Sequence, residues 1–396
     1  MTDDLHGDVK EKDTSYLLQL FLLVIIFFLT FMPRVIPSPI LPVIESSMQV
    51  SHGEATSIFL FISIGYSLSV FLSGFVSSKI SHRSTILFSI LFLSLSMGCT
   101  ILSYDFNTLR ICMLIMGFSV GFYLPSAIAA IVSIVPSRHI GKSIAIHELS
   151  PNLAYLGAPL ICELLLEKIQ WKGIMFIQGI AALLMAFAYL LYGKGGDFKS
   201  KCPNLIIYKE LFKNKTFVVV SILFIFSIAG SMGIFSVLPV YLVSEAGFDM
   251  EEANMVVALS RLPALGIIFI AGWASDRFGV KLTIRFVFLL SGISIFIIGV
   301  APPSAMVPAI FINTISVVCF FPPAFAILAK AGRKYGGNMA VTLAVPLGIL
   351  GGSGIIPNIL GHIADVFSFS LGIACFGIVT IMVTFLTRFI ADDDAE

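Results

Sequence analysis

Charged residues are scarce in this sequence. Lys, Arg, Asp and Glu together make up 12% of its 396 residues, whereas about a quarter of a soluble globular domain is charged. Hydrophobic residues make up 58% of the chain. Because so little charge cannot cover a surface that faces water on all sides, the composition excludes a soluble globule and indicates an integral membrane protein.

Motifs for nucleotide, metal and redox chemistry are also missing. The sequence has no G-x-x-x-x-G-K-[ST] loop, no H-E-x-x-H helix motif and no G-x-G-x-x-G in a strand–helix–strand context. Its six cysteines are scattered singly, without a C-x-x-C pair, and are interpreted as small hydrophobic residues. We therefore expect no enzymatic activity, no cofactor or metal and no nucleic-acid partner, and an energy source in an ion or solute gradient.

Twelve apolar segments follow one another between charged or Gly/Pro-rich breaks. Each is long enough for the roughly 20 residues that cross a bilayer core. All must be helical, because lipid offers the backbone no hydrogen-bond partners. The sequence thus predicts an all-α membrane protein with twelve transmembrane helices, at residues 16–44, 54–77, 84–103, 107–135, 140–166, 172–193, 216–244, 252–275, 282–301, 304–329, 338–364 and 367–390.

Lys and Arg residues are distributed unevenly among the loops. If the N-terminus is cytoplasmic, nineteen of the 24 lie on the cytoplasmic side. Lys168, Lys172 and Arg110 lie at the outer side, and Arg34 and Arg261 lie within spans. Because cytoplasmic loops are enriched in Lys and Arg, this pattern predicts a multi-pass protein of an inner (plasma) membrane with both termini cytoplasmic.

The longest polar interval lies near the middle of the chain and suggests two six-helix halves. Sliding the sequence on itself by 198 residues superposes Gly74 on Gly272 and Pro125 on Pro323, among other matches. The N-terminal tail is interpreted as retained, because the apolar segment after it is too long for a signal peptide. We therefore expect a cytoplasmic tail at 1–15, an N-terminal bundle at 16–193, a cytoplasmic linker at 194–215, a C-terminal bundle at 216–390 and a cytoplasmic tail at 391–396.

One loop motif occurs in both halves. After the eighth span, GWASDRFGVK (272–281) resembles the G-x-x-x-D-R-x-G-x-[RK] loop of the major facilitator superfamily. After the second span, GFVSSKISHRS (74–84) retains the first glycine and two cations, but Ser78 and Ser81 stand where the family usually has Asp and Gly. An acid at one helix end and cations at the next can bridge helices in one transport state and release them in another. The resemblance therefore implies a cytoplasmic gate that consists of Lys79, Arg83, Asp276, Arg277 and Lys281.

The resemblance extends over essentially the whole chain. Arg110, Gly117, Gly121 and Pro125 in the fourth span and GAPL (157–160) in the fifth are also similar to that family. It implies the major facilitator fold, in which two pseudo-symmetric six-helix bundles open a central cavity alternately to either side. It leaves the substrate open, because one fold serves many solutes.

Two arginines lie deep inside apolar spans. Arg261 lies nine residues beyond Glu252, and Arg34 lies eleven residues before Glu45, which places them about 14 and 16 Å from the outer face. Each costs roughly 2.5–3.5 kcal/mol in the bilayer centre, so a compensating partner is expected. Two guanidiniums that face a cavity can bind a carboxylate or phosphate; a structural ion pair or the capping of free carbonyls is the alternative. Arg34 also lies in a pattern similar to organic-anion members of the superfamily, whose first-helix arginine contacts the anion.

A proton-coupled carrier needs a titratable group in its cavity. His147 and Glu148 in the fifth span are the candidates, with Glu148 six residues beyond Lys142, about 9 Å from the cytoplasmic edge. Neighbouring helical side chains point about 100° apart, so at most one of the two faces the cavity squarely. The alternative, weighted equally, is that Glu148 pairs with Arg138 or Lys334 as a cytoplasmic latch. Three further titratable residues near outer helix ends are expected to be solvated: Glu163, His362 and Asp365.

These features predict a monomeric secondary active transporter that moves a small organic anion with protons, as a symporter, by alternating access. Arg34 and Arg261 are expected to bind the substrate, and Glu148 or His147 to carry the proton. The chief alternative is a proton-coupled exporter of drugs or other amphiphiles, because GAPL partly resembles the antiporter signature. A channel, which saturable counterflow would exclude, and a non-transporting receptor of this fold are the other classes.

Overall fold

The computed structural model describes residues 3–202, 205–332 and 339–390. Within these ranges the chain is helical and contains no strand. Among the described residues, eleven helices are long and apolar enough to cross a membrane. They match the predicted spans except the eighth, which is interrupted. The first six spans comprise α1 (Asp3–Val35), α2 (Leu41–Met48), α3 (His52–Lys79), α4 (His82–Cys99), η1 (Thr100–Leu102), α5 (Phe106–Val120), α6 (Tyr123–Ile134), η2 (Ser137–His139), α7 (Ile140–His147), α8 (Leu149–Leu166) and α9 (Trp171–Tyr192).

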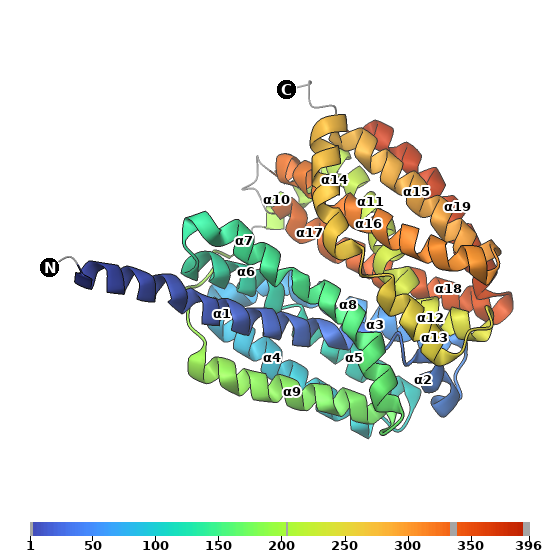
Figure 1. The fold of residues 1–396 in the computed structure, drawn as a ribbon, viewed down its shortest axis with the longest axis horizontal. Helices are drawn as coiled ribbons and strands as arrows, with labels where there is room; N and C mark the ends of the chain where they lie inside the picture. The colour runs from blue at the N-terminus through green and yellow to red at the C-terminus, as the bar shows by residue number, and fades with distance from the viewer. Residues whose placement is uncertain (1–2, 203–204, 333–338, 391–396) are drawn as a thin grey trace.

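The remaining helices follow a short helix in the linker, α10 (Leu205–Lys213). The last six spans comprise α11 (Lys215–Ile228), η3 (Ala229–Gly233), α12 (Ile234–Ser244), α13 (Met250–Leu259), α14 (Ala264–Phe278), α15 (Val280–Val300), α16 (Pro303–Gly332), α17 (Met339–Ile349), η5 (Leu350–Ile355), α18 (Ile356–Val366), α19 (Phe369–Val383) and η6 (Thr384–Phe389). Figure 1 shows the early helices (blue to green) and the late helices (yellow to red) on two sides of the molecule.

Several predicted spans are not single regular helices. The first ends at Val35 and turns before α2, because the prolines at 37 and 39 cannot continue a helix. The eighth ends at Leu259 and resumes at Ala264, after Pro263. The seventh and eleventh each contain a π-helical segment, η3 and η5. These interruptions lie in the middle of their spans, where a buried backbone has carbonyl groups free to accept other hydrogen bonds.

The two halves begin their second helices in the same way. Ser51 and Glu54 form a capping box at the start of α3, and Asp249 and Glu252 form one at the start of α13. The two boxes are 198 residues apart, which is the shift that superposes the halves of the sequence. The internal duplication therefore includes the local chemistry that starts these helices.

Close packing within the first half depends on small residues. A Cβ atom at Gly117 in α5 would collide with the carbonyl of Ile62 in α3, and one at Gly65 would collide with the backbone of Leu114. Helices in lipid associate through this close backbone approach. Conversely, large apolar side chains such as Leu95, Leu191 and Phe385 are exposed on the outside, as expected for surfaces that face acyl chains.

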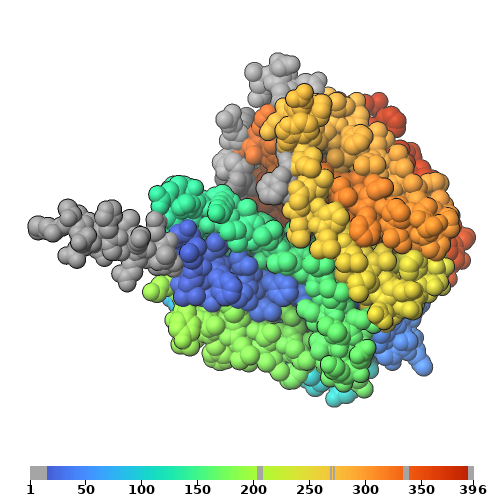
Figure 2. All heavy atoms as spheres, viewed as in Figure 1, coloured from blue at the N-terminus to red at the C-terminus, as the bar shows by residue number. Residues whose placement is uncertain are grey.

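The halves are joined mainly toward the end opposite the linker. Asp365 at the end of α18 accepts hydrogen bonds from the Ser51 hydroxyl (2.8 Å) and the Gly53 amide (3.0 Å) at the start of α3. Asn254 in α13 donates to Glu163 in α8 (2.8 Å). The halves meet along a continuous boundary in the space-filling view (Figure 2). Asp365 and His362 are exposed, as predicted. The prediction did not include the bonds between the halves, in which Asp365 binds the first turn of α3 and Glu163 binds the second turn of α13.

Candidate functional site

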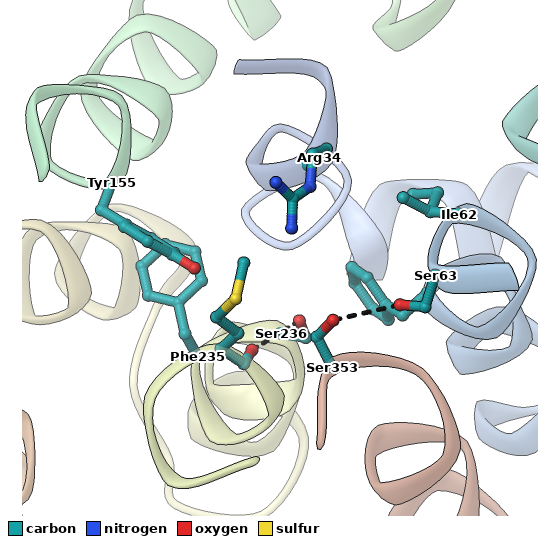
Figure 3. Close-up of a pocket in the computed structure, with 9 residues that line it drawn as sticks. Arg34, Ile62, Ser63, Tyr155, Phe235, Ser236 and Ser353 are labelled. Atoms are coloured by element: carbon teal, nitrogen blue, oxygen red, sulfur yellow. Dashed lines mark hydrogen bonds between the residues drawn. The ribbon is translucent and has the colours of Figure 1, made fainter. Parts of the chain in front are cut away.

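A small cavity lies between the halves, at the depth of the interrupted helices (Figure 3). It contains about 300 Å³ of space free of protein atoms, including the solvent at its mouth. The spans that line it are the first, second and fifth from one half and the seventh and eleventh from the other. Its polar lining residues are Arg34, Ser63, Tyr155, Ser236 and Ser353, and its apolar lining residues are Phe59, Ile62, Met232 and Phe235.

Arg34 occupies the last turn of α1, and its guanidinium points into this cavity (Figure 3). The end of a helix favours a cation, because the last carbonyl groups carry partial negative charge. The guanidinium carbon lies 4.0 Å from the centre of the Tyr66 ring and 4.7 Å from that of Phe31. Among the described residues Arg34 forms no ion pair, so these rings hold its orientation without neutralising its charge.

Arg261 lies in the turn between α13 and α14 and is only 4% exposed. It does not line the cavity, but its guanidinium carbon lies 4.2 Å from the Tyr155 ring centre and 4.7 Å from that of Phe235, and both rings do. Nη2 donates to the Ser231 carbonyl (2.6 Å) and Nη1 to its hydroxyl (3.3 Å). Arg261 thus caps a carbonyl group of the π-helix η3, to which Ser231 belongs. This is the carbonyl-capping role that was the alternative to substrate binding. Its Nε–H is buried without a hydrogen-bond partner.

An aromatic chain joins the two arginines. Phe31 beneath Arg34 contacts Tyr155 edge to face, with ring centres 5.4 Å apart, and Tyr155 contacts Phe235 at 4.7 Å. Arg261 lies over the last two rings. Guanidiniums stacked on rings keep their N–H edges available for planar acceptors such as carboxylate. The structure therefore brings both predicted arginines to one aromatic-walled site, one at the cavity and one adjoining it.

The π-helices place further groups at this site. Ser353 of η5 and Met232 of η3 both line the cavity. The two segments pack so closely that a Cβ at Gly233 would lie 2.5 Å from the Gly352 carbonyl oxygen. π-helical turns recur at functional sites because they shift side chains and release backbone carbonyls.

The second predicted pair, His147 and Glu148, lies where α7 passes into α8. His147 is completely buried, and its ring stacks on Phe27 with centres 4.4 Å apart. Its Nε2 lies 3.0 Å from the Tyr123 hydroxyl oxygen, and its Nδ1 lies 3.5 Å from Glu148 Oε1. Glu148 has a side chain 47% exposed and lies seven residues before Tyr155. Seven residues are two helical turns, so Glu148 shares the face of Tyr155 and lies about 10 Å from it along the helix.

The latch alternative requires that Glu148 pairs with Arg138 or Lys334. The ion-pair partner that the structure gives Glu148 is His147. The Nε of Arg138 contacts the ring of its neighbour His139 at 3.0 Å, and Lys334 lies outside the described residues.

The predicted gate residues lie at the ends of α3, α4, α14 and α15 that face the linker side. Arg83 lies 3.7 Å from Asp197 of the linker and donates to the Leu190 carbonyl (3.2 Å). Asp197 thus provides an acid next to a loop that has Ser78 where the related loop has Asp276. Arg277 is exposed and lies beside the Trp273 ring. The other gate residues, Lys79 and Lys281, lie in the last turn of α3 and the first turn of α15.

Sequence reasoning missed the serines and tyrosines of the site. Ser63, Ser236 and Ser353 resemble many other span serines, and no local pattern separates them. Tyr155 had one usable signal, since it lies two turns from Glu148 on the same helix face. The glycines that flank Ser231 and Ser353 were a weaker signal of irregular helices.

Residues 23–344 match the sequence profile of the Major Facilitator Superfamily. The glycerol-3-phosphate transporter of Bacillus subtilis is 24% identical over 358 residues, which cover 81% of this chain and 80% of that protein.

Solved structures agree on the fold. A D-xylose–proton symporter superposes with a TM-score of 0.79 at 15% identity, covering 96% of this chain and 99% of the other. A bacterial homologue of the human lysosomal transporter Spinster, inward-facing and unoccupied, superposes with a TM-score of 0.77 at 15% identity, covering 95% and 98%. These matches confirm the predicted fold class and a multi-pass membrane protein, and the profile match shows the family. The chain belongs to the major facilitator superfamily, a family of transporters.

Proposed function

We propose that this transporter moves a small organic anion together with protons. The observation that carries the proposal is the pair of arginines without acidic partners. Arg34 faces the cavity, Arg261 is 4% exposed with an unpartnered Nε–H, and neither forms an ion pair with a described residue. A buried cation without a counter-charge is costly. An anionic substrate bound at this site supplies that counter-charge. The counter-charge is lost again when the substrate leaves.

The relatives are compatible with this proposal. Glycerol 3-phosphate, which names the Bacillus subtilis relative, is an anion. The D-xylose relative of known structure is named as a proton symporter. The first name supports an anionic solute, and the second supports coupling to protons.

Hydrogen-bond accounting supports a proton site at His147 and Glu148. The Tyr123 hydroxyl donates its one hydrogen to the Leu23 carbonyl, so it can only accept from His147 Nε2. His147 therefore carries a proton on Nε2, and its Nδ1 faces the Glu148 carboxyl group. A single additional proton, on either Nδ1 or Glu148, turns a contact between two acceptors into a hydrogen bond. The pair is thus built to hold one exchangeable proton beside the half-exposed Glu148.

The conformation fits a carrier caught closed on one side. Hydrogen bonds between the halves run from Ser67 and Pro346 near mid-depth to Ser51 and Asp365 at the end opposite the linker. With the predicted topology, that end is the outer one, and these hydrogen bonds hold it closed in this conformation. We propose that Lys79, Arg83, Asp276, Arg277 and Lys281 form contacts between helices in the opposite conformation, with the linker acid Asp197 assisting Arg83 in this one.

The test is uptake by proteoliposomes containing the purified protein. We expect saturable uptake of organic anions, accelerated exchange when unlabelled anion is present on the other side, and stimulation by an inward proton gradient. Lack of saturation or counterflow would instead indicate a channel.

Export of amphiphiles is the competing proposal, favoured by the apolar wall of Phe59, Ile62, Met232 and Phe235. Proton-driven movement of a cationic drug, with no response to any anion, would establish it and refute the anion assignment.

A further inference from the structure

The serines of the cavity restrict the substrate more closely than its charge does. Ser63, Ser236 and Ser353 come from α3, α12 and η5, and all three line the space beside Arg34 (Figure 3). A serine hydroxyl has one hydrogen to donate and two lone pairs that accept. Which of these a substrate meets depends on where each hydroxyl hydrogen is already bonded.

All three hydrogens are already engaged within the protein. Ser353 donates to the Ile349 carbonyl (2.9 Å), and Ser236 donates to the Met232 carbonyl (2.7 Å). The Ser63 and Ser353 oxygens lie 3.0 Å apart. With the Ser353 hydrogen assigned to the Ile349 carbonyl, the shorter of its two contacts, Ser63 is the donor in the contact between the two serines. All three oxygens are therefore left with lone pairs only, two each on Ser63 and Ser236 and one on Ser353.

The opposite side of the cavity has the complementary chemistry. Arg34 offers only N–H donors and a positive charge, and no acidic residue is among those that line the cavity. The cavity therefore presents donors for an anion at one side and acceptors for a donor group at the other. An unsubstituted aliphatic acid would leave the acceptor side facing carbon, with the serine oxygens desolvated and unpaired.

We infer that the substrate is a hydroxy acid: an anion whose carbon chain carries at least one hydroxyl group, bound by Arg34 at the acid and by Ser63, Ser353 and Ser236 at the hydroxyl. This inference builds on the proposed anion transport. An ammonium group would also satisfy the acceptors, but it is disfavoured because the cavity lining supplies Arg34 and no carboxylate. A hydroxyl group donates without bringing a second charge.

The Ser63–Ser353 contact also links the two halves, because α3 and η5 lie in different halves of the chain. A substrate hydroxyl that donates to Ser63 or Ser353 binds at the seam that must separate when the cavity opens on the other side. The contact between Ser63 and Ser353 can therefore couple substrate binding to the separation of the two halves.

The experiment measures ligand affinity of the full-length protein in detergent by thermal stabilisation, with matched ligands. Lactate is compared with propionate, and gluconate with hexanoate. The pair 2-hydroxyethyl phosphate and ethyl phosphate tests whether a phosphate can replace the carboxylate. Alanine, compared with lactate, tests an ammonium group in place of the hydroxyl. We expect each hydroxyl-bearing anion of the preferred acid type to bind at least about fivefold more tightly than its partner, the ratio for one neutral hydrogen bond.

The serine variants identify the source of that preference. Ser63→Ala combined with Ser353→Ala should reduce the ratio of lactate to propionate affinity, because Ser236 is then the one serine acceptor left in the described cavity lining. Ser294→Ala is the matched control, because Ser294 makes the same bond to the carbonyl four residues earlier but lies in α15, away from the cavity lining. Propionate binding also shows that the double variant remains folded.

The outcomes separate this inference from the proposed function. If hydroxylated and unsubstituted acids bind equally, the hydroxy-acid inference is refuted and anion transport stands. If alanine binds more tightly than lactate, the donor is an ammonium and the inference is again refuted. If no anion binds but cationic amphiphiles do, the proposed function fails and the inference fails with it.

Discussion

Arg261 illustrates how one side chain serves fold and site together. Two of its donors satisfy a carbonyl and a hydroxyl of Ser231, and its flat face covers Tyr155 and Phe235. These contacts fix the guanidinium but do not neutralise it. Its remaining Nε–H and its charge raise the electrostatic potential beside the cavity that Arg34 lines. We therefore assign direct anion contact chiefly to Arg34 and support of the site to Arg261.

The proposed proton coupling depends on a single side chain, Glu148. A Glu148→Gln variant keeps the shape but cannot share an exchangeable proton with His147 Nδ1. We expect counterflow of the substrate to persist and stimulation by an inward proton gradient to be lost, measured in proteoliposomes. Glu167→Gln, at an exposed position near the other end of the same helix, should behave as the unaltered protein. Full gradient stimulation in Glu148→Gln would remove Glu148 as the proton carrier.

At the scale of the helices, the site depends on π-helical segments within otherwise regular spans. The π-helix η5 brings Ser353 to the cavity, and Gly352 lets it lie against α11 and η3. A Cβ at Gly352 would lie 2.5 Å from the Ile225 carbonyl oxygen and 2.6 Å from the Ala229 nitrogen. Both are backbone atoms, so the collision cannot be relieved by rotating a side chain.

A Gly352→Ala substitution should therefore destabilise the protein by about 1–3 kcal/mol, as expected for overpacking. Thermal unfolding in detergent should show a lower midpoint and weaker ligand stabilisation. Gly98→Ala in α4 is the control, because a Cβ there meets nothing within 4 Å, and its midpoint should be unchanged or raised. Equal midpoints for the two variants would show that η5 is not closely packed in solution.

The sequence predicts regular elements better than irregular ones. Apolar length and composition located the spans, because the bilayer imposes both. A constant rise per residue predicted a similar depth for Arg34 and Arg261, and the structure brings both to one aromatic-walled site. The π-helices did not follow, since they arise from packing of glycines against a distant helix. The same limit applies to Ser63, Ser236 and Ser353, which become one group only when three helices from two halves meet.

At the scale of the whole molecule, two related contacts join the halves. Glu163 near the end of the fifth span binds Asn254 in the first turns of the eighth, and Asp365 near the end of the eleventh binds the start of the second. The duplicated sequence relates these pairs of spans. Both must break for the cavity to open at this end, so they stabilise the conformation seen here.

Removing one of these contacts should shift the conformational equilibrium. In a variant whose six cysteines are replaced by serine, Ser236→Cys reports access to the cavity by a membrane-impermeant thiol reagent. Adding Asp365→Ala should raise the labelling at position 236 several-fold when the reagent is applied on the side of the membrane where α2 lies. The reason is that α3 loses the acid that caps its first turn. Glu251→Ala, an exposed acid near the start of α13, should leave labelling unchanged. Unaltered labelling in Asp365→Ala would mean that this contact does not hold the end closed.

In the whole molecule, the proposed transport depends on an anion held by Arg34 in the central cavity. The most direct test is the apparent affinity of the transported anion for the Arg34→Gln variant, measured from the concentration dependence of counterflow. The control is the Arg388→Gln variant, which alters an exposed arginine. We predict that Arg34→Gln weakens the apparent affinity by about 10- to 100-fold, the effect of a charge-assisted hydrogen bond, while Arg388→Gln leaves it unchanged. Equal affinities for the two variants would contradict the account.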